Sequence, residues 1–218
     1  MYHRIDFLRR GLAPITRRLT VDPRAFSSQM EWLARHAFHA ITQLQLFDAL
    51  MRGAPLPRHA VMITFDDGYG DVLGKASLVL VRLHLPATAY IITSRVSAGD
   101  PSFLTWGELE ALQRRGFEIG SHTVTHRDLR SLGDAQAHGE LASSRRTLEE
   151  HLGHPVQWLA YPAGREDGRI VALARAAGYV LAVTTRPGSE QRADDPLELR
   201  RYEVLDTTTL AQLASFVR

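Results

Sequence analysis

The sequence predicts an α/β fold in which parallel strands alternate with helices, as an open sheet or a barrel, in one domain covering residues 1–218. Three observations support this prediction. Short apolar runs alternate with helical patterns along the chain. A length of 218 residues with 44% hydrophobic residues is enough for one full core. Finally, we find no internal repeat, low-complexity segment or linker that would divide the chain.

Five apolar runs are the expected strands, at residues 60–65, 87–93, 117–120, 156–161 and 179–185. The first is rich in β-branched residues and is followed by Gly68 and Gly70, which typically end a strand in a flexible turn. Asp66 and Asp67 therefore stand at the carboxyl end of a strand. Sites in parallel α/β folds gather at these ends, so the aspartates are candidates for chemistry.

Three helices have recognisable ends in the sequence. Asp22 followed by Pro23 is a typical N-cap and first helical residue. Thr105 begins a capping box three residues before a glutamate. We expect Asp134 to cap a longer helix that ends at Gly153.

Composition excludes several classes of function. The formal net charge is only +2 and the arginines are scattered in pairs, which does not favour a nucleic-acid partner. Because there is no cysteine, disulfides, thiolate metal sites and cysteine nucleophiles are excluded, leaving histidine and carboxylate as metal ligands. We see no apolar run of membrane-spanning length and no signal-peptide pattern in this chain.

A second motif, "SHTVTH" at residues 121–126, follows the third expected strand. Two histidines four residues apart can face the same way, so His122 and His126 can chelate a cation. Two histidines and one carboxylate make a three-ligand site with an open position, and the other aspartate of the Asp66-Asp67 pair is then free to act as a base. For the remaining histidines outside the N-terminus we expect no metal site: His36, His39, His59, His84, His138, His151 and His154.

These motifs resemble the polysaccharide deacetylases of carbohydrate esterase family 4, the NodB-homology group. Residues 64–68 match the family's T-F-D-D-G motif, and residues 122–126 match H-[ST]-x-x-H. Further similar stretches run almost from end to end: Tyr2-His3, "FLTW" at 103–106, "AYPAG" at 160–164, "AGY" at 177–179 and "RRYEV" at 200–204. The resemblance implies a distorted (β/α)7-type barrel and removal of N-acetyl, sometimes O-acetyl, groups from glycans, in an extracytoplasmic setting.

Carried over residue by residue, the resemblance implies that Asp67, His122 and His126 bind a divalent cation. Zinc is the expected ion, with cobalt or nickel as alternatives. Asp66 would be the general base.

The resemblance assigns further roles around this centre. The backbone N–H of Tyr161 would hold the oxyanion, although a packed strand end is an equal alternative. Thr123 would orient the histidine loop. Tyr69, Trp106 and Pro162 are expected to contact substrate, with a core role as the alternative for Trp106.

Two departures from the family pattern affect catalysis. Ala160 stands where the commonest third motif has the arginine that tethers the catalytic aspartate, and Arg165 is the nearby candidate to replace it. The usual C-terminal histidine is also missing, since none follows His154. Tyr2-His3 resembles the N-terminal pair of the subgroup that acts on poly-N-acetylglucosamine, so His3 is the expected general acid.

The sequence therefore predicts a metal-dependent N-deacetylase acting on an N-acetylhexosamine polymer. Two alternatives stay open: an O-acetyl esterase, whose alkoxide leaving group needs less help from an acid, and a catalytically impaired glycan-binding domain of the same fold. The intact metal motifs argue against the last. The oligomeric state is not predicted.

Overall fold

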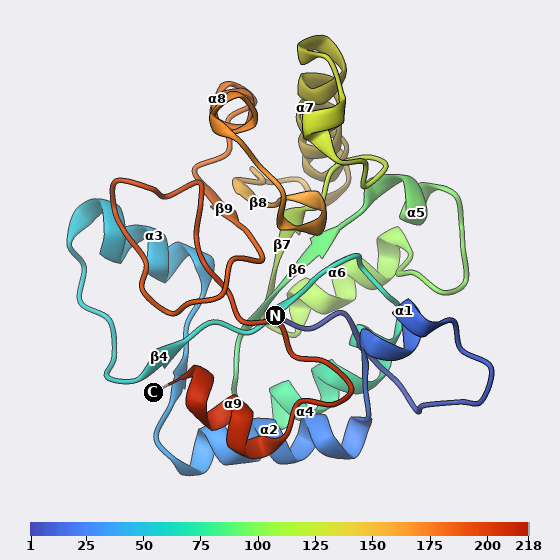
Figure 1. Cartoon of the computed structure of the whole chain (residues 1–218), viewed down its shortest axis with the longest axis vertical. Helices are drawn as coiled ribbons and strands as arrows, with labels where there is room; N and C mark the ends of the chain where they lie inside the picture. The colour runs from blue at the N-terminus through green and yellow to red at the C-terminus, as the bar shows by residue number, and fades with distance from the viewer. Residues whose placement is uncertain (218) are drawn as a thin grey trace.

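The computed structural model describes residues 1–217. Its centre is a five-stranded parallel sheet in the order β5-β6-β7-β8-β9 (Figure 1). The strands are β5 Thr64–Phe65, β6 Ala87–Ile91, β7 Phe117–Ser121, β8 Trp158–Ala160 and β9 Leu181–Val183. Because sequential neighbours pair in parallel, their carboxyl ends lie along one edge of the sheet.

Both ends of the chain close this sheet into a distorted barrel, as predicted. Tyr2 forms a parallel bridge with β5, and Leu199 forms one with β9. The segment after Leu199 then reaches the N-terminus: the amine of Met1 donates to the Tyr202 carbonyl at 2.6 Å, and Val204 N–H donates to the Met1 carbonyl at 2.9 Å. The first residues therefore lie inside the barrel wall and are not frayed.

Two small sheets flank the barrel. β1 Arg4–Ile5 pairs with β2 Thr20–Val21, and β3 His39–Ala40 pairs with β4 Ala60–Val61. The prediction of one strand over 60–65 is therefore wrong in part. The apolar run forms two strands, because β4 pairs with β3 whereas β5 pairs with β6.

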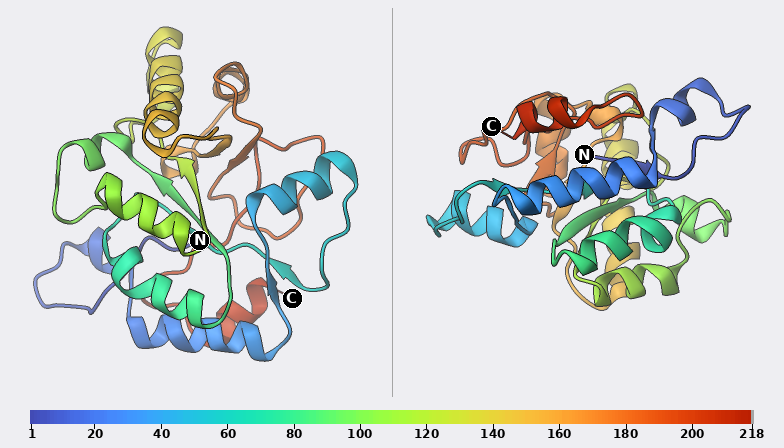
Figure 2. Two further views of the ribbon diagram at one scale, coloured as in Figure 1. Left: turned by 180° about the vertical axis from the view of Figure 1, so that it is seen from behind. Right: turned by 90° about the horizontal axis from the view of Figure 1, so that it is seen from below.

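Helices cover the outside of the sheet. They are α1 Pro14–Arg18, α2 Pro23–Arg35, α3 Gln43–Arg52, α4 Ser77–Arg82, α5 Thr93–Ser97, α6 Trp106–Arg114, α7 Asp134–Leu152, α8 Gly168–Ala176 and α9 Leu210–Phe216, with short helical turns η1 Val72–Ala76, η2 Leu129–Ser131 and η3 Pro162–Gly164. α2 packs against both α4 and α9, as Figure 2 shows from below. None of the described helices combines the length and hydropathy needed to cross a bilayer.

Most predicted helix ends are confirmed. The Asp22 side chain caps α2, Thr105 forms a complete capping box at α6, and Gly153 ends α7 with a left-handed φ of 73°. The prediction for Asp134 is wrong: Gly133 is the N-cap of α7, and the Asp134 carboxylate pairs with an arginine of α8 at 2.8 Å.

Candidate metal centre and active site

Three metal-ligand side chains meet at the carboxyl ends of β5 and β7. Asp67 follows β5, and His122 and His126 follow β7. The Oδ1 atom of Asp67 lies 3.5 Å from His122 Nε2 and 3.8 Å from His126 Nε2. The three candidate donor atoms lie within 4.8 Å of one another.

These spacings fit a divalent cation. Two ligands that each lie about 2.1 Å from a tetrahedral zinc ion are about 3.4 Å apart, close to the separations of these donors. His122 Nδ1 bonds the Ala160 carbonyl at 2.7 Å, so Nδ1 carries the proton and Nε2 keeps its lone pair toward Asp67. The structure thus provides a candidate Asp-His-His site with an open fourth position.

The histidine loop has a strained backbone that local hydrogen bonds hold in place. Thr123 and His126 have φ angles of 67° and 60°, in the left-handed region that non-glycine residues rarely adopt. Thr123 N–H donates to Ser121 Oγ, and Thr123 Oγ1 accepts from His126 N–H, each at 3.1 Å. Thr123 therefore fixes the loop between the two histidines.

Glu140 on α7 also holds this loop, a role that the sequence analysis missed. Its carboxylate accepts from the N–H groups of Val124 at 3.0 Å and Thr125 at 2.8 Å, and from Thr125 Oγ1 at 2.6 Å. Charge-assisted bonds of this kind are roughly twice as strong as neutral ones. No local pattern in the sequence points to Glu140, since it lies on the helix after the motif.

Asp66 is tethered by Arg201, not by the predicted Arg165. Arg201 NH1 and NH2 donate to the two carboxylate oxygens of Asp66, each at 2.8 Å, and Arg201 also donates to Thr64 Oγ1 and the Thr184 carbonyl at 3.0 Å. Arg165 is exposed and pairs elsewhere, with an aspartate at 3.2 Å. Arg201 lies in the "RRYEV" stretch, next to β9 in the closed barrel. It therefore takes the place of the arginine that the commonest family motif has where this chain has Ala160.

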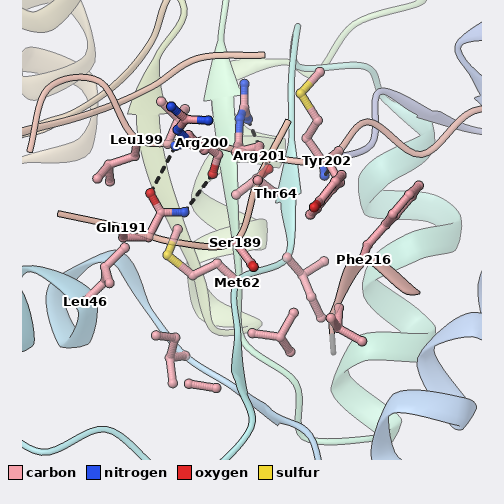
Figure 3. A pocket seen from close by; sticks show the side chains of 18 of the residues that line it. Leu46, Met62, Thr64, Ser189, Gln191, Leu199, Arg200, Arg201, Tyr202 and Phe216 are labelled. Carbon is pink, nitrogen blue, oxygen red and sulfur yellow. Dashed lines mark hydrogen bonds between the residues drawn. The ribbon is translucent and has the colours of Figure 1, made fainter. Parts of the chain in front are cut away.

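An apolar cavity of about 420 Å³ lies next to Arg201 (Figure 3). Thr64 and Arg201 form part of its wall, together with apolar side chains such as Met62, Leu199 and Phe216. None of the three metal donors lines it. The cavity therefore contributes to the apolar surroundings of Arg201 rather than forming the reaction site.

Burial and neighbouring charges set the protonation of the site. Burial alone would raise the pKa of Asp66, but the charge and hydrogen bonds of Arg201 hold it well below its usual range. Burial, with the Asp66 charge, raises the pKa of Asp67 to about 7. Burial lowers the pKa of His122 to about 3 and also lowers the pKa of His126. Both histidines are therefore neutral near pH 7, as metal ligands must be.

His3 lies beside Asp66 in a buried position. Tyr2 pairs with β5 through its backbone, and its carbonyl accepts from Asp66 N–H at 2.9 Å. Burial lowers the pKa of His3 to about 4, while the Asp66 charge opposes that change. His3 Nδ1 is buried and has no hydrogen-bond partner among the described residues. The imidazole is thus neutral at rest, and one of its nitrogens is available for a ligand or water.

The Tyr161 backbone N–H, the expected oxyanion donor, donates to the Val183 carbonyl at 3.2 Å, and its oxyanion role stays a prediction. The N–H belongs to the pairing of β8 with β9, and the side chain is fully buried. Pro162, expected to contact substrate, is buried in η3. The packed strand-end alternative therefore describes this segment.

The two aromatic candidates for substrate contact have protein partners. Tyr69 stacks on Phe103 with ring centroids 4.7 Å apart, and its hydroxyl lies beside Asp67. Trp106 stacks on His151 at 3.8 Å and packs against the core. The core alternative for Trp106 is therefore the better description, whereas Tyr69 borders the metal donors.

Comparison with known proteins agrees with this geometry. The sequence model of the polysaccharide deacetylase family matches residues 53–182. Bacillus subtilis YxkH, named for that family, is 30% identical over 186 residues, which are 85% of this chain and 66% of YxkH. The poly-beta-1,6-N-acetyl-D-glucosamine N-deacetylase of Staphylococcus epidermidis is 26% identical over 170 residues, 71% of this chain and 57% of that protein. The chain therefore spans less than two thirds of the length of each relative.

Solved structures have the same architecture. The Streptococcus pyogenes deacetylase PplD, in complex with acetate, superposes with a TM-score of 0.91 at 25% identity, covering 100% of this chain and 96% of PplD. The polysaccharide deacetylase BC0361 of Bacillus cereus superposes with a TM-score of 0.85 at 29% identity, covering 100% of this chain and 67% of BC0361. With the family match covering more than half of its residues, the chain belongs to the polysaccharide deacetylase family.

Proposed function

We propose that this chain is a metal-dependent hydrolase that removes N-acetyl groups from an N-acetylhexosamine-containing polysaccharide. The observation that carries the proposal is the convergence of the Asp67, His122 and His126 donors beside a second carboxylate, Asp66, fixed by Arg201. The names of the S. epidermidis and S. pyogenes relatives, an N-deacetylase and a deacetylase, support the same chemistry.

Asp67, His122 and His126 would hold the cation, which we propose to be zinc, with cobalt or nickel as alternatives. When bound, such an ion polarises an acyl oxygen and lowers the pKa of a water molecule. The chain itself supplies the remaining steps: a base for that water, and a proton for the leaving nitrogen.

Asp66 is the proposed base. The bidentate bond with Arg201 keeps Asp66 ionised and fixes the direction of its free lone pairs. A carboxylate with a lowered pKa is a weak base, so it can take a proton only from an acidified water. The two adjacent carboxylates therefore have different proposed roles. Asp67 faces the histidines and is the metal ligand, whereas Asp66 faces Arg201 and is the base.

His3 is the proposed carrier of the proton to the amide nitrogen. Because its imidazole is neutral at rest, His3 must first receive a proton, and the nearby Asp66 is its proposed source. The unpaired Nδ1 provides an atom that can do this without breaking a protein hydrogen bond. The alternatives differ at this step: an O-acetyl esterase depends less on His3, and a binding domain does not use it.

The test is acetate release by the metal-loaded chain from N-acetylglucosamine oligomers, peptidoglycan and acetylxylan. We expect release from an N-acetylated substrate, and a turnover lower by about 10²- to 10⁴-fold after replacement of Asp66 by Asn. Release from acetylxylan alone would favour the O-acetyl esterase. Binding of the glycans without acetate release from any of them would favour the glycan-binding domain.

A further inference from the structure

Arg95 projects from a helix that is attached directly to the histidine loop. Thr93 N–H donates to the Thr123 carbonyl at 3.2 Å, and Ser94 N–H donates to the Val124 carbonyl at 3.0 Å. Arg95 is the next residue of α5, and its side chain is exposed. The main chain therefore fixes the base of this arginine relative to the metal donors.

Aromatic stacking also orders the Arg95 guanidinium. Its Cζ atom lies 5.4 Å from the centre of the Phe103 ring, Phe103 stacks on Tyr69 at 4.7 Å, and Arg4 lies over the Tyr69 ring at 4.7 Å. The two arginines differ in their partners. Arg4 pairs with Asp71 at 3.0 Å, whereas no carboxylate in residues 1–217 forms an ion pair with Arg95.

The charge of the site leaves Arg95 without a counterion. The charges of Asp66 and Arg201 balance each other in their bidentate ion pair. Asp67 then supplies the remaining negative charge at the site, and this single charge would have to balance both Arg95 and a bound divalent cation. An occupied centre would therefore carry a surplus positive charge facing solvent.

We propose that Arg95 is a specificity-determining residue that binds a carboxylate or phosphate group of the glycan, close to the acetamide that is hydrolysed. This inference rests on the proposed deacetylase function and narrows its substrate to an acidic N-acetylated glycan. A stacked guanidinium is a planar, pre-organised fork that matches both groups with two parallel hydrogen bonds. A neutral glycan offers no anionic group to pair with the Arg95 guanidinium.

The test compares substrates that differ only in charge. The metal-loaded full chain is assayed with an N-acetylhexosamine–uronate oligosaccharide and with the same oligosaccharide after methyl esterification of its carboxylates. A phosphate-bearing N-acetylhexosamine oligomer and its neutral parent form the second pair. We expect kcat/KM to be about 10- to 100-fold higher for the acidic member of one pair, mainly through KM, as for one bidentate charge-assisted contact. The pair with this preference identifies the group as carboxylate or phosphate.

Arg95→Gln should bring the acid-to-neutral ratio to about one while metal content, measured by atomic emission, stays the same. Arg146→Gln, a change at an exposed arginine on α7, should retain the wild-type ratio. An equal rate on both members of both pairs, or a ratio that survives Arg95→Gln, would overturn the proposal. Calorimetric measurement of the binding of the same acidic and neutral substrates tests the role of Arg95 separately from the deacetylase function. Absence of acetate release from every substrate would count against the deacetylase, whereas the binding ratio would still decide the role of Arg95.

Discussion

Replacing Arg201 tests the proposed tether of the catalytic base. The Arg201 and Asp66 side chains are only 7% and 3% exposed, so solvent screens their ion pair little. Removing one partner of a buried pair typically costs about 3–5 kcal/mol because the other charge is left unpaired. That is a large part of the roughly 5–15 kcal/mol by which a domain is stable. Arg201→Ala is therefore expected to be strongly destabilised.

Arg201→Lys keeps the charge and is the more informative variant. A lysine ammonium is a point donor and cannot reproduce the fork that meets both Asp66 oxygens at 2.8 Å. Loss of one hydrogen bond to a charged group should cost about 1.5–3 kcal/mol in the free energy of unfolding. The loosened Asp66 should lower kcat more than it raises KM, because the position of the base matters after substrate has bound.

The assays are urea denaturation and steady-state acetate release, with metal content measured in parallel. A double-mutant cycle with Asp66→Asn and Arg201→Met isolates the coupling, which should be several kcal/mol for a buried charged pair. A coupling near zero, or an Arg201→Lys enzyme with wild-type kcat, would refute the reasoning.

The remaining predictions concern the metal, its loop and the two proton carriers. Exhaustive chelation should abolish activity and Asp67→Ala should lose the metal; full activity of metal-free protein would contradict this. Asp66→Asn should keep the metal, measured by atomic emission, yet lose about 10²- to 10⁴-fold in turnover. Glu140→Gln should weaken metal affinity about 10-fold in a chelator competition, in the range known for outer contacts of metal sites, whereas Glu150→Gln on the same helix should not. His3→Ala should reduce amide cleavage far more than cleavage of an activated acetate ester, without loss of metal.

The sequence predicted those parts of the site that lie in short continuous motifs. Two motifs can be recognised from a few adjacent residues: the carboxylate pair at a strand end and the two histidines four residues apart. Parallel pairing brings the two strand ends together. The capping box at Thr105 is a similar case, because side chain and backbone partners lie within one turn. Where the partner lies in another element, prediction failed: the run 60–65 divides because its first half pairs with β3 and its second half with β6.

The same reasoning applies to the Tyr161 N–H, the expected oxyanion donor. Whether a backbone N–H is free depends on the neighbouring strand, and β9 supplies the Val183 carbonyl that occupies Tyr161 N–H. Glu140 was missed for the related reason that α7 returns over the histidine loop only in the folded chain. Hydrogen-bond partners between elements are thus the information that local patterns do not contain.

Arg201 tethers Asp66, the proposed base, from a different part of the chain than the arginine of the commonest family motif. The residue at the end of β8, where the family motif commonly has arginine, is Ala160, and its carbonyl orients His122 instead. The next position around the barrel is β9, and residues 199–204 lie between β9 and Met1, so an arginine there also reaches Asp66. Because residues 1–2 join this segment to β5, His3 reaches the site by the same closure. Both departures from the family pattern therefore concern the segments that close the barrel: Arg201 forms the ion pair with Asp66, and His3 is the proposed acid.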